Sequence, residues 1–271
     1  MLSLFIKQHG RWFWEVKRVK PERGVVDKER LDTLLVKKGF TISRSKAKAV
    51  ILSGSVLVNG KVMDKAGTAV SIHAQINIKG GDIPYVSRGG LKLEKALNEF
   101  NIDVRDKVAL DVGAGTGGFT DCLLQHGAKR VFAVDVGYGQ IDFKLRQDPR
   151  VILLERQNIR YLKKEAICDI LDLVTVDVSF ISLKKVIPSI KNLIKEDGEV
   201  IALIKPQFEV GRGEVEKGGV VRNAQKHHRV IQEITHFCEN LGFRVMGVTE
   251  SPILGPKGNR EFLIYLRNVL S

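Results

Sequence analysis

The stretch Leu110-Asp111-Val112-Gly113-Ala114-Gly115-Thr116-Gly117-Gly118-Phe119-Thr120 decides the fold of this chain. The apolar run from Val108 to Val112 is typical of a buried strand, and four glycines then fall within six positions. Apolar residues at Phe119, Leu123 and Leu124 predict a helix directly afterwards. Glycine allows positive φ and close approach of a ligand, and the free N–H groups of a helix start face that ligand. The stretch therefore predicts a strand, a tight turn and a helix that hold a small polar molecule.

The glycines alone do not choose this molecule, because Gly113, Gly115 and Gly118 also satisfy the fingerprint of dinucleotide-binding turns. Asp111 favours S-adenosylmethionine (SAM), since a carboxylate there would repel a pyrophosphate but suit the ammonium group of SAM. Asp135 ends the next apolar strand, at the spacing of a carboxylate that accepts both ribose hydroxyls of a nucleoside. We expect SAM as the cofactor, with NAD as the alternative.

The composition indicates a polyanionic partner. Lys and Arg outnumber Asp and Glu by 44 to 31 in a chain of 271 residues, and the formal net charge is +13. Such an excess favours nucleic acid. Cys122, Cys168 and Cys238 show no metal-ligand spacing, so we expect buried, reduced thiols and no metal site. No apolar run approaches the roughly 18 residues that cross a bilayer, and we expect a cytoplasmic protein without membrane contact.

The chain divides into four expected parts. Residues 1–27 form a basic extension without a sustained period, which we expect to be poorly ordered. Residues 28–80 form a small α+β domain, residues 81–87 a glycine- and proline-containing linker, and residues 88–271 an α/β domain. In this last domain the apolar strands alternate with helices, which predicts a mostly parallel, Rossmann-like sheet of seven strands. The expected strands are Val108–Val112, Arg130–Asp135, Val151–Leu154, Leu171–Asp177, Glu199–Ile204, Arg244–Glu250 and Glu261–Leu266.

Polar side chains collect where these strands end. Asp111, Asp135, Asn158, Asp177 and Lys205 all fall at or just past carboxyl ends, where ligands of parallel sheets bind. After the fourth strand the chain reads Asp-Val-Ser-Phe, without the double proline and aromatic residue that methylases of exocyclic amines use. Cysteine is absent there too, so attack on a pyrimidine carbon lacks its nucleophile. Among exocyclic amines, pyrimidine carbons and oxygens as methyl acceptors, the sequence therefore favours an oxygen.

The small domain presents positive charge on two helices and a hairpin. Ser43 is an expected cap of the second helix, and Asn59-Gly60 predicts a tight turn between two short strands. The sequences Arg30-Leu-Asp, Ser43-Arg-Ser-Lys-Ala-Lys-Ala-Val-Ile and Gly54-Ser-Val-Leu-Val-Asn-Gly-Lys61 resemble the RNA-binding module named after ribosomal protein S-four. Cations on such a surface neutralise phosphates. The expected RNA-binding residues are Arg30, Lys37, Lys38, Arg44, Lys46 and Lys48, with Arg88 in the second domain.

The second domain resembles a known family along nearly its whole length. The motifs are Ser87-Arg88-x-x-x-Lys92-Leu93, Asp111-Val-Gly-Ala-Gly-Thr-Gly-Gly-Phe-Thr120, Ala133-Val-Asp-Val-Gly-Tyr-Gly-Gln140, Val176-Asp-Val-Ser-Phe-Ile-Ser182, Leu203-Ile-Lys-Pro-Gln-Phe-Glu209 and Gly255-Pro-Lys-Gly-Asn-Arg-Glu261. They are similar to the TlyA family, also called hemolysin A, among the FtsJ-like ribose methyltransferases.

This resemblance implies a SAM-dependent 2′-O-methyltransferase that acts on a cytidine ribose of ribosomal RNA. Its tetrad of lysines and carboxylates falls by motif on Lys92, Asp177, Lys205 and Glu261. Lys205 would be the base, with Lys92 lowering its pKa and placing the hydroxyl, while the two carboxylates orient the lysines. By spacing, Lys92 lies off the core face of its helix. The expected cofactor-binding residues are Asp111, Gly113, Gly115, Thr116, Gly117, Gly118, Phe119, Asp135, Val136, Asn158 and Asp177.

Three other functions remain open at this stage. An RNA-binding ribosome assembly factor could keep the fold without turnover, although the intact tetrad argues against it. Membrane lysis, suggested by the older family name, would be indirect, because the sequence offers no long cationic amphipathic helix. An NAD-linked oxidoreductase would differ in the cofactor that it binds. We expect ribosomal subunits as partners, and a monomer. Relative to longer members of the family the chain stops soon after the last strand, and shorter members resemble enzymes of the large subunit, so we favour the large subunit.

Overall fold

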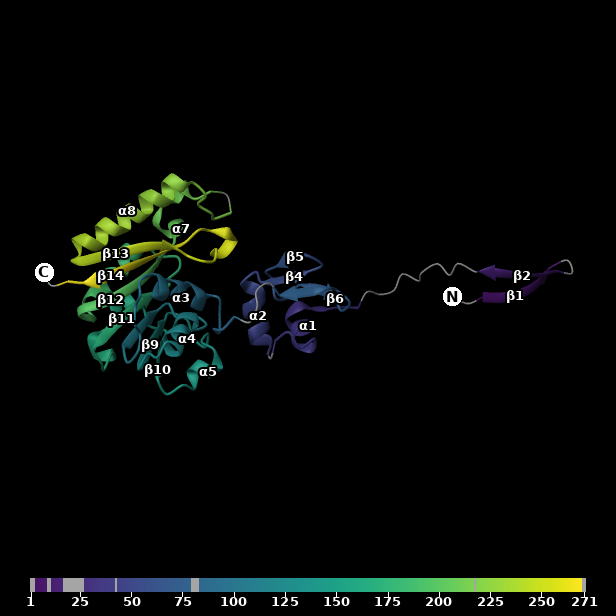
Figure 1. Cartoon of the computed structure of the whole chain (residues 1–271), viewed down its shortest axis with the longest axis horizontal. Helices are drawn as coiled ribbons and strands as arrows, with labels where there is room; N and C mark the ends of the chain where they lie inside the picture. The colour runs from purple at the N-terminus through teal and green to yellow at the C-terminus, as the bar shows by residue number, and fades with distance from the viewer. Residues whose placement is uncertain are drawn as a thin grey trace. The chain divides into compact units, whose positions relative to one another are not determined.

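The computed structural model divides the chain into two compact units, residues 1–80 and 81–271 (Figure 1). The structure describes residues 3–8, 11–16, 27–41, 43–78, 83–216 and 218–269.

The larger unit contains a seven-stranded sheet with the order β10-β9-β8-β11-β12-β14-β13. The five strands from β10 to β12 are parallel, and β14 runs antiparallel to both β12 and β13. This architecture confirms the expected Rossmann-like, mostly parallel sheet. Its strands are β8 Val108–Val112, β9 Arg130–Asp135, β10 Val151–Glu155, β11 Leu171–Val176, β12 Ile194–Ile204, β13 Phe243–Glu250 and β14 Phe262–Asn268.

Helices cover both faces of this sheet. The α-helices are α3 Gly89–Glu99, α4 Gly118–Gln125, α5 Phe143–Arg146, α6 Ile187–Lys191, α7 Pro206–Glu209 and α8 Ala224–Asn240. Short 3-10 helices are η1 Ile159–Tyr161, η2 Lys164–Ala166, η3 Leu183–Lys185, η4 Arg212–Glu214 and η5 Pro256–Gly258.

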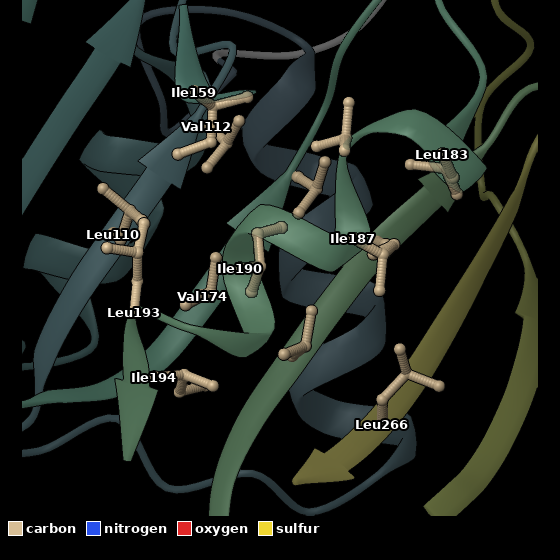
Figure 2. Close-up of a cluster of buried hydrophobic side chains, with 14 of the residues drawn as sticks. Leu110, Val112, Ile159, Val174, Leu183, Ile187, Ile190, Leu193, Ile194 and Leu266 are labelled. Carbon is tan, nitrogen blue, oxygen red and sulfur yellow. The ribbon is translucent and has the colours of Figure 1, made fainter. Parts of the chain in front are cut away.

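Alternation along the strands divides the core into two layers. Leu110 and Val112 of β8 pack on one face with Ile187 and Ile190 of α6 (Figure 2), in a cluster that also contains apolar residues of α8. Ala109 packs on the other face, in a cluster formed with α3, α4 and α5. Successive side chains of a strand point to opposite faces, so a continuous apolar strand supplies both layers at once.

The direction of β14 decides what meets at the carboxyl edge of the sheet. Parallel strands β8, β9, β11 and β12 all end at this edge. Because β14 is antiparallel to β12, its first residue Phe262 pairs with Ile204, the last residue of β12. Glu261 and Lys205 directly adjoin this pair in sequence. The topology therefore brings Glu261, just before the last strand, to the edge where the parallel strands end.

The smaller unit contains the expected helices and hairpin. Ser43 caps α2 Arg44–Leu52 by accepting a hydrogen bond from the Lys46 backbone N–H at 3.2 Å. Asn59 and Gly60 have φ of 50° and 78° in the turn between two antiparallel strands, as a tight hairpin requires. The other elements are α1 Leu31–Lys37, β3 Lys28–Arg30, β4 Val56–Val58, β5 Lys61–Met63, β6 Ala69–Ser71 and β7 Ile76–Ile78.

In the N-terminal extension, β1 Ser3–Gln8 and β2 Arg11–Val16 form an antiparallel pair, while residues 17–26 lie outside the described part. Poor order of residues 1–27 stays a prediction. The expectation of buried thiols is wrong for Cys168, which is exposed. Cys122 and Cys238 are buried, and burial raises the pKa of each thiol to about 12.

Candidate active site

A cavity of about 500 Å³ lies at the carboxyl edge of the large sheet. It opens beside the ends of β8, β9 and β11, where the residues that follow each strand turn away from the sheet. Its wall combines a glycine turn, polar side chains and one exposed aromatic ring. The lining residues are Val112, Gly113, Gly115, Val134, Asp135, Val136, Gln140, Gln157, Asn158, Ile159, Asp177, Val178, Ser179, Phe180, Ile181 and Val186.

The glycine turn is fixed by close backbone approach. Gly113 has φ +83°, and a Cβ there would lie 2.6 Å from the Asp177 carbonyl oxygen. Gly117 has φ +94°, and a Cβ there would strike the Leu145 side chain. A larger residue at either position would meet both strain and a clash. The turn between β8 and α4 therefore depends on glycine to bring backbone to the cavity wall.

Asp135 is hydrogen-bonded through its carboxylate to the backbone of this turn. Its carboxylate accepts hydrogen bonds from the backbone N–H groups of Gly115 at 2.8 Å and Gly137 at 2.7 Å, and it lines the cavity. Asn158 lies on the neighbouring segment after β10, and its Oδ1 accepts from the Arg160 backbone N–H at 3.1 Å. A carboxylate and an amide thus border the same end of the cavity, as a nucleoside sugar and base would require.

Asp111 lies beneath the turn, fully buried and outside the cavity wall. Thr120 of α4 donates to one carboxylate oxygen at 2.7 Å, and Thr175 of β11 donates to the other at 3.1 Å. Burial raises the pKa of Asp111 to about 7, against the opposing effect of these two hydrogen bonds. Asp111 therefore ties β8 to α4 and β11. Its expected contact with the ammonium group of SAM remains a prediction.

Lys205 lies at the end of β12 beside the cavity. Its Nζ is 2.6 Å from Asp177 Oδ1 and donates a hydrogen bond to Ser179 Oγ at 2.8 Å. The lysine side chain is only 8% exposed. Burial raises the pKa of Asp177, but the charges of Lys205 and Lys92 outweigh burial, and the net pKa lies below its ordinary value. Asp177 is therefore ionised and held between two cations.

The second lysine pairs with a carboxylate from the other end of the domain. Lys92 Nζ of α3 donates to Glu261 Oε2 at 2.6 Å, with Lys92 8% exposed and Glu261 fully buried. The Gln207 amide lies 3.5 Å from the other Glu261 oxygen. A Cβ on Gly255 would strike the Glu261 carboxylate, so glycine leaves the room for it. The four expected catalytic residues thus form two lysine–carboxylate pairs, and the charge of Lys92 also lowers the pKa of Asp177 in the other pair.

In the smaller unit, two of the expected RNA-binding residues, Arg30 and Arg44, donate hydrogen bonds to the same buried carboxylate, Asp32. Arg30 donates to both Asp32 oxygens, at 3.0 and 2.9 Å, and Arg44 donates to Oδ2 at 3.0 Å. Asp32 is fully buried, while the arginine side chains stay 52% and 56% exposed. Hydrogen bonds from Arg30 hold the pKa of Asp32 well below its usual range, against burial. Two guanidinium groups are therefore fixed side by side at the surface.

The model of the FtsJ-like methyltransferase family matches residues 85–268, and the model of the S4 domain matches residues 29–76. The chain belongs to the FtsJ-like methyltransferase family. Its methyl donor is SAM, and the glycine turn, the Asp135 carboxylate and the cavity fit such a nucleoside-containing molecule. Among the residues that the structure describes, no group of three or more His, Cys, Asp or Glu could hold a metal ion.

Several relatives cover most of this methyltransferase. The chain is 44% identical to the 16S/23S rRNA (cytidine-2′-O)-methyltransferase TlyA of Mycobacterium tuberculosis, over 88% of this chain and 89% of the relative. It is 46% identical to Hemolysin A of Brachyspira hyodysenteriae, over 87% and 98%. A solved Streptococcus thermophilus structure, described as a hemolysin candidate, is 44% identical with a TM-score of 0.73, over 91% and 90%. No helix within the described ranges is long and apolar enough to cross a membrane.

The methyltransferase cavity includes some of the expected cofactor-binding residues. Gly113, Gly115, Asp135, Val136, Asn158 and Asp177 line it. Thr116 is exposed, whereas Gly117, Gly118 and Phe119 are buried at the start of α4, and these four lie with Asp111 outside the wall.

Sequence reasoning missed other residues of the wall. Gln140, Gln157, Ser179 and Phe180 line the cavity, although none was expected to bind the cofactor. Each follows a strand end by only a few positions. That position at the carboxyl edge was the available signal.

Proposed function

We propose that this methyltransferase transfers the methyl group of SAM to the 2′-oxygen of a cytidine ribose in ribosomal RNA, with the large subunit as the favoured substrate. The contact of Lys205 with Asp177 and Ser179 beside the cavity carries this proposal. A ribose hydroxyl is a weak nucleophile and needs a base within hydrogen-bond reach. The Lys205 amine lies next to residues of the cavity wall, whereas the Lys92 amine donates its hydrogen bond to the fully buried Glu261.

In the proposed step, SAM supplies an electrophilic methyl group bonded to a sulfonium sulfur. Neutral Lys205 Nζ accepts the proton of the 2′-hydroxyl while the hydroxyl oxygen attacks the methyl carbon in line. The new O–C bond forms as the C–S bond breaks, and the electron pair of that bond stays on sulfur. The products are a 2′-O-methyl ribose, S-adenosylhomocysteine and a protonated Lys205.

The carboxylates favour this proton transfer. Once Lys205 is neutral, Asp177 keeps a negative charge 2.6 Å from the nitrogen that receives the proton. An anion at that distance stabilises the ammonium group that forms. Glu261 balances the charge of Lys92, so Lys92 can remain an ammonium near the reacting oxygen. We assign Lys205 as the base, Lys92 as the cation that helps place the hydroxyl, and the carboxylates as orienting groups.

For the cofactor, we assign Gly113, Gly115 and Asp177 to the methionine part of SAM and Asp135 to its ribose hydroxyls. Gly113 supports this assignment because a side chain there would collide with Asp177. Asp135 supports it because the carboxylate borders the cavity from the end of β9. Asn158 and Val136 lie next to Asp135 in the wall and suit the adenine ring.

The choice of ribosomal RNA rests on the smaller unit and on the relatives. The S4 domain presents Arg30 and Arg44 on a rigid support, with exposed Lys37, Lys38 and Lys48 on the same helices or just beyond them. Such cations bind phosphates of folded RNA. A 35% identical relative from Campylobacter jejuni is named a 23S rRNA (cytidine-2′-O)-methyltransferase, and 23S appears in the name of the Mycobacterium relative too. We therefore favour the large subunit, and a cytoplasmic site of action.

The test is a methyl-transfer assay with tritiated SAM on unmethylated 30S and 50S subunits, followed by mapping of 2′-O-methylation on both RNAs. The proposal expects one or a few cytidine riboses to gain the label, with transfer to 50S subunits. Lys205→Ala serves as the matched inactive control. Binding of SAM and of subunits by the wild-type protein without label on any ribose would overturn the proposal and favour an assembly factor.

A further inference from the structure

Ser179 makes the directional contact to the proposed base. Its hydroxyl accepts the hydrogen bond of Lys205 Nζ at 2.8 Å. Asp177 Oδ1 is closer, at 2.6 Å, but lies off hydrogen-bond geometry, so that oxygen is buried without a hydrogen-bond partner. Asp177 therefore supplies mainly charge, whereas Ser179 supplies direction.

The backbone around Ser179 is held in a costly conformation. The next residue, Phe180, has φ +63° although it is a bulky aromatic residue, and its side chain is 90% exposed. A non-glycine residue in the left-handed region is strained, and such positions concentrate at functional sites. The Phe180 ring lies 5.0 Å from that of Phe208, centroid to centroid. The strained turn thus connects the segment after β11 to the helix that follows Lys205.

A second tie joins the same two segments. Glu209 of α7 accepts hydrogen bonds from the Ser182 hydroxyl at 2.6 Å and from the Leu183 backbone N–H at 2.8 Å. The segment that follows Ser179 is therefore tied to α7 at two places, close to the Lys205 amine that Ser179 contacts. A side chain on an exposed loop that is held in this way is pre-organised for its partner.

We propose that Ser179 is a positioning residue that orients the amine of Lys205 toward the ribose hydroxyl. A neutral amine has two N–H bonds and one lone pair at tetrahedral angles. With one N–H donated to Ser179, rotation about the Cε–Nζ bond is restricted, and the lone pair takes one of the two remaining tetrahedral directions. Loss of the serine hydroxyl frees rotation about the Cε–Nζ bond, so the amine presents its lone pair to the hydroxyl for a smaller share of the time.

This inference rests on the proposed function, in which Lys205 is the base. The experiment compares wild type with Ser179→Ala, Ser179→Thr and Ser189→Ala in methyl transfer to unmethylated ribosomal subunits, with kcat and KM measured separately. We expect Ser179→Ala to lower kcat by about 10- to 100-fold, since a misplaced reacting group costs up to about 10²-fold. KM for subunits and the Kd for SAM stay within about twofold. Ser179→Thr keeps the hydroxyl and restores most of kcat.

Ser189→Ala is the matched control, because Ser189 lies on α6 and its hydroxyl donates to the Arg160 carbonyl, at 3.5 Å. Its kcat should equal that of wild type. An unchanged kcat in Ser179→Ala, or a raised KM with unchanged kcat, would overturn the positioning role while leaving the proposed function intact. A wild-type protein without methyl transfer would instead refute the proposed function. Thermal melting of each variant, and the threonine rescue, separate misfolding from misorientation.

Discussion

Lys92 Nζ and Glu261 Oε2 lie 2.6 Å apart although the two residues are separated by 169 positions in the chain. Both side chains are buried. The pair joins α3, at the start of the domain, to the segment that leads into β14, its last strand. Burying two charges is costly, and only their mutual attraction and good geometry offset the desolvation. The pair therefore fixes Lys92 beside the carboxyl edge of the sheet. It does so at a cost in stability that a pair of apolar side chains would not have.

Removing one partner of this pair should be worse than removing both. Glu261→Gln leaves the buried Lys92 ammonium group without its hydrogen-bonded counter-charge, and we expect a loss of about 3 kcal/mol in the free energy of unfolding. The double variant Lys92→Met/Glu261→Gln removes the charge as well and should recover part of that loss. Urea unfolding of the two single variants and the double variant measures the coupling. Strictly additive changes would contradict the pair as described.

Lys205→Ala should abolish methyl transfer while SAM still binds. The substitution removes the proposed base, but it leaves the glycine turn and Asp135 intact. The expected fall in kcat is at least about 10²-fold, and the Kd for SAM, measured by calorimetry, should stay close to that of wild type. Lys195→Ala, which breaks a surface ion pair with Asp172, is the control and should keep full activity. Full activity in Lys205→Ala would refute the assignment of the base.

Gly113→Ala should weaken SAM binding more than Gly139→Ala does. Both glycines have positive φ, so each substitution carries a strain of about 1–2 kcal/mol. Only at Gly113 does the added Cβ also meet backbone, 2.6 Å from the Asp177 carbonyl oxygen, whereas Gly139 has open space. We expect at least about a tenfold rise in the Kd for SAM at Gly113, as roughly 1.4 kcal/mol gives that factor. Equal effects at the two positions would show that strain alone matters.

The stability of the methyltransferase domain should fall as pH rises from about 4 to 7. Burial raises the pKa of Asp111 to about 7 from an ordinary value of 3.8, so within this window the folded state holds a proton that the unfolded state has released. The contribution of the Asp111 proton to the free energy of unfolding is thus fully present below pH 3.8 and is lost as pH rises through 7. This loss is on the order of 4 kcal/mol at most. Asp111→Asn should flatten this slope in urea unfolding at pH 5 and pH 8. A slope as steep as that of wild type would assign the dependence to other groups.

Exposed lysines of the S4 domain should set the salt dependence of RNA binding. Lys48 lies exposed on α2, and its loss removes about one phosphate contact. Lys48→Ala should therefore weaken binding of ribosomal RNA and lower the slope of log K against log salt concentration by about 1. The control is Lys129→Ala, an exposed lysine of the other unit just before β9. Identical slopes for both variants and wild type would remove Lys48 from the interface.

The local signals of the sequence were sufficient for much of the fold. The glycine turn after β8, the alternation of apolar strands with helices, and the Asn59-Gly60 hairpin each depend on neighbours within a few positions. The family motifs also selected both lysine–carboxylate pairs that the structure brings together. Residues of the wall such as Ser179 and Phe180 were not selected, because their part in the site depends on a strained turn and on contacts to α7.

The sequence by itself determined where the strands lie along the chain, where the glycine turn falls and which types of side chain stand at the strand ends. These features follow from periodicity and from backbone sterics. Only the tertiary structure decided which of them meet. Lys92, expected off the core face of its helix, is buried because antiparallel β14 returns Glu261 to the edge where β12 ends. Asp111, expected at the ligand, lies under α4 because β8 turns that side chain to the face which α4 covers. Register between distant strands is set by long-range packing, which no local pattern encodes.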